Sequence, residues 1–152
     1  TEKGFVAPLK NYVSTGKPIL GICLGMQILC KKSEEGKLAG LGLLDGDIKS
    51  LTNLGCQGKV PHVGFNEIKP ASSTDSFFLS SSGKDFYFVH SFALGSVCSN
   101  NDTALAMTEY SGARFISAIH SKNIFATQFH PEKSGESGIQ LLSEFVKCSK
   151  NA

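Results

Sequence analysis

Residues 18–29 read PILGICLGMQIL, and this stretch decides the fold. Residues 18–22 form a short apolar run that predicts a buried strand, and Leu24–Leu29 have the pattern of the first turns of a helix. Cys23 would then stand on the turn between them. A side chain there projects from the top of a sheet toward the helix N-terminus, which is the geometry of a nucleophile elbow. Because the helix dipole favours a thiolate, we expect the pKa of Cys23 to lie below the ordinary value of about 8.5.

A second motif, QFHPE at residues 128–132, follows another apolar run. A cysteine paired with a histidine and a carboxylate can attack an amide carbonyl and form a thioester that water resolves. We interpret Cys23 as the nucleophile, His130 as its base, and Glu132 as the carboxylate that orients the imidazole. Side chains at i and i+2 of an extended segment share a face, so Glu132 would accept from one ring nitrogen while the other faces Cys23.

The elbow also offers backbone groups to a substrate. The N–H of Leu24, the residue after the nucleophile, stands where one oxyanion donor is usually found. Gly25 would let the backbone and a substrate approach closely.

Composition limits the possible classes of protein. A chain of 152 residues that is 41% hydrophobic and 18% charged has enough apolar material for one globular domain. The net charge of +2 comes from scattered residues, so we expect no nucleic-acid partner. The sequence has no apolar run near the roughly 18 to 20 residues that span a bilayer, and residues 1–4 have no signal-peptide pattern. We therefore expect a cytoplasmic protein that does not bind a membrane.

The five cysteines are widely spaced and include no Cys-x-x-Cys pair. This pattern argues against a disulfide framework and against a structural zinc site, and we expect neither a metal nor a cofactor. Four of the five are interpreted as buried thiols that act as small hydrophobic groups: Cys30, Cys56, Cys98 and Cys148.

Helices are predicted at both ends of the sequence. The first would have Phe5, Leu9, Tyr12 and Val13 near one face and end at Gly16. The last would have Ser134 as its N-cap and an apolar face of Ile139, Leu142, Phe145 and Val146.

Strands are predicted between the helices. They fall at residues 47–51, 60–68, 86–90, 105–110, 115–120 and 124–129, with polar loops at 72–74 and 80–83. This order of elements predicts an α/β sheet with an antiparallel extension.

The strings GICLGMQ and QFHPEKS together resemble the class I (triad) glutamine amidotransferases, in which cysteine, histidine and glutamate hydrolyse glutamine and deliver ammonia to a partner. The resemblance implies a three-layer, flavodoxin-like α/β sheet. The motifs KVPHVGFN at residues 59–66, YFVHSF at 87–92 and KS at 133–134 narrow it to the glutaminase subunits of imidazole glycerol phosphate synthases. The matching segments run from about Gly16 to Val146.

The resemblance implies roles for particular residues. Cys23, His130 and Glu132 would be catalytic, and the substrate-binding positions would be Leu24, Gln27, Ser91 and Phe92. Positions facing a (β/α)8 cyclase partner, where ammonia enters its tunnel, would be Phe65, Asn66, Tyr87 and Lys133. The family usually has Trp where Phe65 stands and more often Tyr where Phe92 stands.

The family also has an opening strand, a helix and a Pro-Gly-x-Gly turn upstream of the helix with which this sequence begins. None of the five prolines here precedes a glycine. The resemblance therefore implies that residues 1–152 are a partial, N-terminally truncated amidotransferase domain, which we expect to be poorly stable and nearly inactive alone.

Other interpretations stay open on the sequence. A related glutaminase could serve another synthase, for example in sugar amination, or a non-catalytic relative could keep only the partner face. Taken alone, His62 is more simply a loop histidine bonded to a backbone carbonyl, and His90 could hold a strand end by hydrogen bonding. His120 would lie exposed, and Lys133 could be a solvated charge.

Overall fold

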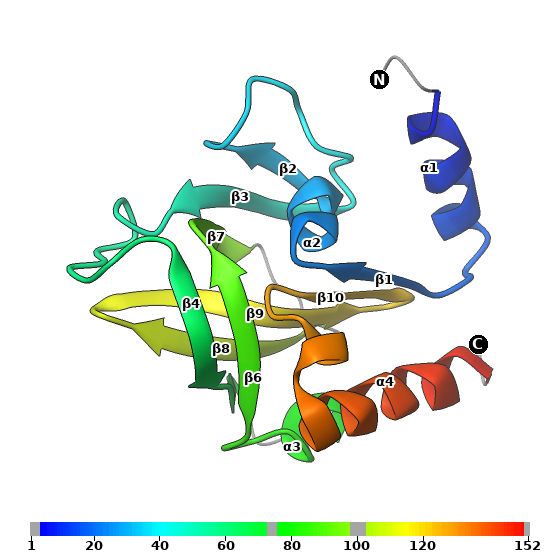
Figure 1. Cartoon of the computed structure of the whole chain (residues 1–152). Helices are drawn as coiled ribbons and strands as arrows, with labels where there is room; N and C mark the ends of the chain where they lie inside the picture. Colours follow the sequence, from blue (N-terminus) through cyan, green and yellow to red (C-terminus); the bar gives the residue numbers. More distant parts are fainter. Residues whose placement is uncertain (1–3, 73–75, 98–102, 151–152) are drawn as a thin grey trace.

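A computed structural model describes residues 4–72, 76–97 and 103–150 (Figure 1). Neighbouring strands of its main sheet follow the order β1, β10, β9, β7, β3, β2, with β8 paired to β9 and β5 to β8. β1 is parallel to β10, and β2 is parallel to β3, while the other pairs are antiparallel. The strands are β1 (Ile19–Ile22), β2 (Cys30–Ser33), β3 (Leu44–Ser50), β5 (Lys69–Pro70), β7 (Phe92–Val97), β8 (Thr103–Tyr110), β9 (Ala113–Ser121) and β10 (Ile124–Thr127).

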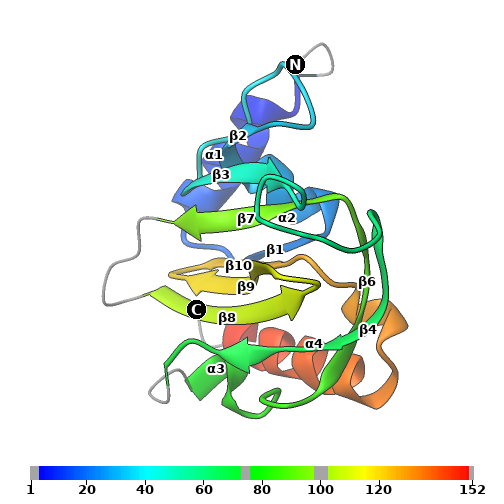
Figure 2. The same ribbon diagram turned by 90° about the vertical axis from the view of Figure 1, so that its left-hand side faces the viewer.

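Helices cover both faces of this sheet, which confirms the predicted α/β three-layer class. They are α1 (Val6–Ser14), α2 (Leu24–Leu29), α3 (Ser76–Leu79), the 3-10 turn η1 (Pro131–Lys133) and α4 (Gly135–Lys150). Both views show α1 and α4 on opposite sides of β1 and β10 (Figures 1 and 2).

Each face of the sheet has its own hydrophobic core because successive side chains of a strand point to opposite faces. One core joins Val13 of α1 and Met26 of α2 to Leu94 of β7. The other joins Leu141 of α4 and Phe78 of α3 to Ala93, the neighbour of Leu94. The sheet is therefore buried on both sides.

A second, two-stranded sheet lies beside the main one. It consists of β4 (His62–Glu67) and antiparallel β6 (Asp85–His90). Figure 1 shows β4 and β6 running across the direction of β8 and β9. One face, with Phe86 and Phe88, belongs to the second core, whereas Val63 and Phe65 on the other face are exposed.

Most predicted elements are present with shifted ends. β1 and α2 lie where the motif predicts them, and each predicted strand corresponds to an observed one. β2, β5, β7 and α3 were not predicted. The predicted loop at residues 72–74 falls largely outside the described residues.

The predicted apolar faces of the two terminal helices are partly wrong. In α1, Val13 is buried, whereas Phe5 just before the helix and Tyr12 within it are exposed. In α4, Ile139 and Val146 are exposed, and Leu141 packs into the core in their place.

The cysteines other than Cys23 are described in three cases. Cys30 is fully buried, as expected, and burial followed by the charge of Asp47 raises the pKa of its thiol to about 12. Cys56 and Cys148 are only half-buried free thiols, and Cys98 lies outside the described residues. Among the helices of the described ranges, not one is both long and apolar enough to cross a membrane.

Candidate active site

The parallel pairing of β1 with β10 brings the two sequence motifs together. Ile22 is in register with Thr127, so both strands end at the same edge of the sheet. The backbone N–H of Cys23 continues the pairing by donating to the carbonyl of Thr127 at 2.7 Å. Gln128 and His130 therefore follow beside Cys23, although about one hundred residues separate them in the chain.

Cys23 has the strained backbone of a nucleophile elbow, with φ of 50° and ψ of −106°. The turn is tight because Gly21 has no side chain. A Cβ there would lie 2.7 Å from Cδ1 of Leu29 and 2.8 Å from the backbone of Gly25. A Cβ at Gly25 would meet nothing within 4 Å, so the chain itself crowds Gly21 and leaves Gly25 open, and the close approach of a substrate at Gly25 stays a prediction.

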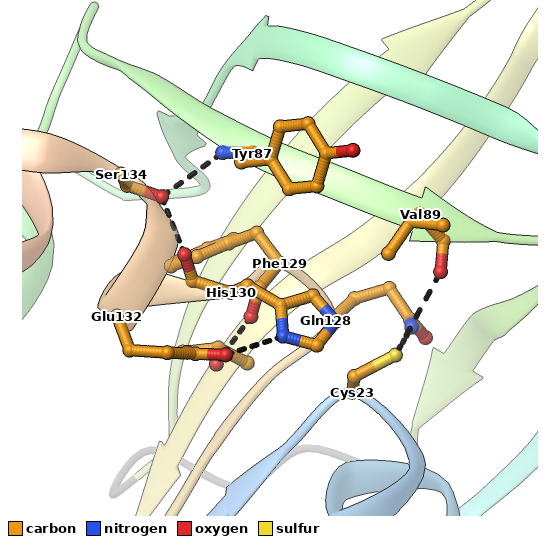
Figure 3. Close-up of polar contacts among 9 residues, drawn as sticks. Cys23, Tyr87, Val89, Gln128, Phe129, His130, Glu132 and Ser134 are labelled. Carbon is orange, nitrogen blue, oxygen red and sulfur yellow. Dashed lines mark hydrogen bonds and ion pairs between the residues drawn. The ribbon is translucent and has the colours of Figure 1, made fainter.

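His130 and Glu132 form the predicted hydrogen bond. Nδ1 of His130 lies 2.6 Å from Oε1 of Glu132 (Figure 3). The predicted extended backbone is wrong, because Pro131–Lys133 form a 3-10 turn, yet the turn still brings the two side chains together. Burial alone would raise the pKa of Glu132, but the hydrogen bond from His130, a backbone N–H and the nearby positive charges lower it.

The backbone around His130 is held from two sides. Its N–H donates to the carbonyl of Tyr87 on β6 at 2.8 Å. The hydroxyl of Ser134, predicted to cap α4, instead donates to the carbonyl of His130 at 2.6 Å and accepts from the N–H of Tyr87. In Figure 3 the imidazole has Glu132 on one side and Cys23 on the other.

The sulphur of Cys23 has a mixed electrostatic environment. Burial raises the pKa of its thiol, and the carboxylates of Glu35 and Glu132 raise it further, whereas hydrogen bonds from Leu24 N–H and the Gln128 amide lower it. The net direction is upward, so the predicted low pKa is wrong. Burial is the largest effect on this pKa and exceeds that of the N–H of Leu24 at the start of α2.

A cavity of about 360 Å³ opens beside the sulphur. It is lined by Cys23 and all four expected substrate-binding residues, Leu24, Gln27, Ser91 and Phe92, together with Glu35, Pro61, Val89 and His90. Glu35 was not predicted. Its carboxylate suits a cationic ligand group, such as an amino acid ammonium.

Three of the four expected interface residues lie together. The rings of Phe65 and Tyr87 meet edge to face with centroids 5.5 Å apart, and Nζ of Lys133 lies 5.9 Å from the Tyr87 ring. Asn66 is separate, because its side chain points to the opposite face of β4, where its Nδ2 donates to the carbonyl of Glu109 at 3.0 Å.

The predicted surroundings of two histidines are wrong. His62 lies in a strand, 2% exposed, and its Nδ1 is 3.0 Å from Nε2 of His90. His120 is half-buried against the Phe125 ring, with centroids 3.9 Å apart. The expected role of His90 is confirmed, since its Nδ1 bonds to the carbonyl of Phe92 at the strand end.

Sequence reasoning also missed Gln128. Its Nε2 lies 3.6 Å from the sulphur of Cys23, and its position two residues before the expected catalytic histidine was the available signal. Within the described ranges, His, Cys, Asp and Glu side chains do not form a group of three that could hold a metal ion.

Comparison with known proteins agrees with this geometry. The family model of class I glutamine amidotransferases matches residues 2–148. The chain is 40% identical to imidazole glycerol phosphate synthase subunit HisH 1 of Legionella pneumophila (strain Lens), over 97% of this chain and 72% of that protein. It is 41% identical to the HisH subunit of Bdellovibrio bacteriovorus, over 95% of this chain and 71% of that protein.

A solved structure agrees at the level of the fold. A crystal structure of a glutamine amidotransferase superposes with a TM-score of 0.69 at 13% identity, covering 98% of this chain and 70% of that one. The chain thus spans about 70% of the length of each of these proteins.

Proposed function

Since the chain belongs to the class I glutamine amidotransferases, we propose that it hydrolyses glutamine as the glutaminase subunit of an imidazole glycerol phosphate synthase. The observation that carries the proposal is the His130–Glu132 hydrogen bond beside Cys23, whose side chain lines a cavity with the polar residues Gln27, Glu35 and Ser91. The HisH relatives support the choice of synthase.

The reaction follows from the roles of the three side chains. The sulphur of Cys23 attacks the side-chain carboxamide carbon of glutamine while His130 takes the thiol proton. The N–H of Leu24, which lies beside the sulphur, stabilises the oxyanion. His130 then returns the proton to the leaving nitrogen, so the C–N bond breaks, ammonia leaves and a thioester remains.

Water resolves the thioester. His130 removes a proton from the water, the C–S bond breaks, and glutamate leaves with Cys23 restored. Glu132 accepts from Nδ1 throughout, so that Nε2 is the nitrogen that exchanges protons. Gln27, Ser91 and Phe92 line the glutamine site, and Glu35 suits its ammonium group.

The partner of the proposal is a (β/α)8 cyclase subunit that uses the ammonia. Its docking surface on this chain is the exposed face of β4 and β6, with Phe65, Tyr87 and neighbouring Lys133. Exposed aromatic and aliphatic side chains on one face are typical of an interaction site. Asn66 is assigned to the support of this face rather than to contact with the partner.

The proposal includes a cytoplasmic location, because a reducing compartment keeps a cysteine nucleophile free. The extent of the domain, residues 1–152 as part of an amidotransferase domain, stays a prediction.

Covalent trapping tests the proposed chemistry. A chloroketone analogue of glutamine, added to the full natural chain with its cyclase partner, should label Cys23, and Cys23→Ala should abolish labelling. Cys148→Ala is the matched control and should keep it. Absence of labelling in the wild-type complex would contradict the glutaminase proposal and favour a non-catalytic module.

Stimulation by the partner tests the proposed synthase. Glutaminase activity should rise when the cyclase and its nucleotide substrate are added. If labelling occurs but activity does not rise with this partner, the chain is a glutaminase of another synthase.

A further inference from the structure

Four polar side chains lie buried beneath the site and have no part in the proposed chemical steps. The exposed fractions are 2% for His62, 5% for His90, 7% for Gln27 and 0% for Gln128. Burying such groups costs free energy unless each finds a hydrogen-bond partner. Their partners are one another together with Asn66, the carbonyl of Phe92 and the sulphur of Cys23, and the chemistry of these groups assigns the donor of each hydrogen bond.

At the β4 end of this set of hydrogen bonds, backbone groups around Asn66 determine which atom is the donor to His62. Oδ1 of Asn66 accepts from the N–H of Glu67 at 2.8 Å, and Nδ2 donates to the carbonyl of Glu109 at 3.0 Å. The amide nitrogen therefore also faces Nε2 of His62, 3.4 Å away. A nitrogen that receives this donor carries no hydrogen, so the neutral His62 ring carries its hydrogen on Nδ1.

The donor and acceptor nitrogens of His90 are determined by the backbone carbonyl of Phe92. Nδ1 of His90 lies 2.9 Å from the oxygen of Phe92, which can only accept, so Nδ1 of His90 carries the hydrogen. Nε2 of a neutral His90 is then an acceptor. It faces Nδ1 of His62 at 3.0 Å, which the Asn66 end independently makes a donor. The two deductions agree.

The same carbonyl of Phe92 is connected to the sulphur of Cys23 through the side chains of Gln27 and Gln128. Nε2 of Gln27 donates to it at 3.1 Å and to Oε1 of Gln128 at 3.3 Å. With its oxygen taken by Gln27, the Gln128 amide must present its nitrogen to Cys23, at 3.6 Å (Figure 3). An unbroken set of hydrogen bonds thus joins β4 to the sulphur.

We propose that the His62–His90 pair, with both hydrogens on Nδ1, is a positioning unit that orients Gln27 and Gln128 so that Gln128 donates to the sulphur of Cys23. The inference rests on the proposed role of Cys23 as the nucleophile. A donor aimed at the sulphur favours the thiolate, which opposes the effect of burial. The two histidines are positioning residues, because His62 does not border the cavity and His90 acts through a carbonyl.

The pair is rigid because aromatic rings enclose it. His62 stacks between Phe88 and Tyr110, with ring centroids 4.8 and 4.0 Å away. His90 meets Phe115 edge to face at 5.1 Å. These contacts allow a competing explanation, that the histidines are merely flat side chains that fill the core, and the experiments below separate the two.

The tautomers can be measured on the wild-type protein. Long-range nitrogen–hydrogen NMR spectra of a histidine-labelled sample should show both His62 and His90 protonated on Nδ1 and free on Nε2 at about pH 7.5. If either ring carries its hydrogen on Nε2, the assigned directions fail and the proposal is overturned.

Two variants of His90 test the effect on the nucleophile. Asn places its amide nitrogen near the position of Nδ1 and should keep the bond to the Phe92 carbonyl, whereas Phe keeps the ring and loses the donor. His90→Phe should slow iodoacetamide alkylation of Cys23 about fivefold to tenfold at about pH 7 and shift its pH profile upward. His90→Asn should stay within about twofold of wild type.

The controls separate fold from function. Alkylation of each cysteine is followed by peptide mass spectrometry, and Cys148, on α4, should react at one rate in all three proteins. The carboxylates of Glu35 and Glu132, which also act on Cys23, are unchanged. An unaltered Cys23 profile in folded His90→Phe, or equal slowing in both variants, would overturn the proposal. Iodoacetamide needs no glutamine site, so this outcome is independent of labelling by the glutamine analogue.

Discussion

Nδ1 of His62 donates to Nε2 of His90 across 3.0 Å, and both rings are almost completely buried. The contact holds only while His90 is neutral, because a second proton on His90 would place two N–H groups face to face, and a second proton on His62 would do the same to its contact with Nδ2 of Asn66. Burial lowers the pKa of both histidines to about 4, and for His62 the charge of protonated His90 acts in the same direction.

The depressed pKa values predict how stability depends on pH. The unfolded chain binds protons on these histidines near pH 6.5, whereas the folded chain binds them only near pH 4. The free energy of unfolding should therefore be highest above pH 6.5 and fall as the pH drops toward 4. The slope should be about 1.4 kcal/mol per pH unit for each histidine that titrates in this way.

Urea unfolding at several pH values measures this slope. His90→Asn removes one titrating ring and should reduce the slope. A free energy of unfolding that stayed constant from about pH 7 to about pH 5 would contradict the neutral pair.

Gly21→Ala should destabilise the elbow. The new methyl group would lie 2.7 to 2.9 Å from Leu29 and the backbone of Gly25, so the turn must open. We expect a loss of about 1 to 3 kcal/mol in the free energy of unfolding, measured with urea. The matched control is Gly25→Ala, where a Cβ meets nothing within 4 Å and alanine favours the helix. A larger loss at Gly25 than at Gly21 would refute this account of the turn.

Glu132→Gln should lower kcat for glutamine hydrolysis in the complex by on the order of 10²-fold, with little change in KM. Glu132 accepts from Nδ1 of His130 at 2.6 Å and so leaves Nε2 as the exchanging nitrogen. A glutamine amide can donate to Nδ1 instead and stabilise the other tautomer. Steady-state kinetics test this, and Glu136→Gln, in the first turn of α4, is the control. Equal kcat values for the two variants would show that the carboxylate does not orient the base.

Phe65→Ala should weaken binding of the cyclase partner by about tenfold or more while leaving folding stability nearly unchanged. The Phe65 side chain is 62% exposed and packs only on its outer-face neighbour Tyr87 among the rings described. Leu38→Ala, at a side chain 74% exposed outside this face, is the control. Calorimetric titration gives both dissociation constants. Partner affinity that is insensitive to Phe65 would place the interface elsewhere.

Local patterns in the sequence predicted the elements that hold the reactive groups. The apolar run and the helical spacing around Cys23 are local signals, so β1 and α2 lie where they were expected. β7, with the sequence FALGSV, was missed because apolar and polar residues do not alternate along it as they do in a half-buried strand. Its two adjacent residues Ala93 and Leu94 are both buried, and a glycine follows them. β2 has four residues, of which Lys31, Lys32 and Ser33 are polar, so its sequence has no apolar run or alternation that predicts a strand.

The environment of the polar residues was beyond local patterns. His62 follows a proline and precedes a glycine by two positions, which favours a loop. Its burial depends on the register of β4 against β6, which places it opposite His90. The raised pKa of Cys23 likewise depends on burial and on the charges of Glu35 and Glu132, which come from two separate segments. Contacts of this kind are fixed by tertiary packing.

The carbonyl of Phe92 accepts from both His90 and Gln27, so the connection between the buried histidines and the sulphur passes through backbone at that point. Replacing the side chain at position 92 cannot delete that oxygen. Substitutions at position 92 could therefore change the shape of the cavity wall, and with it the choice of ligand. The backbone oxygen would still accept the hydrogen bonds from His90 and Gln27.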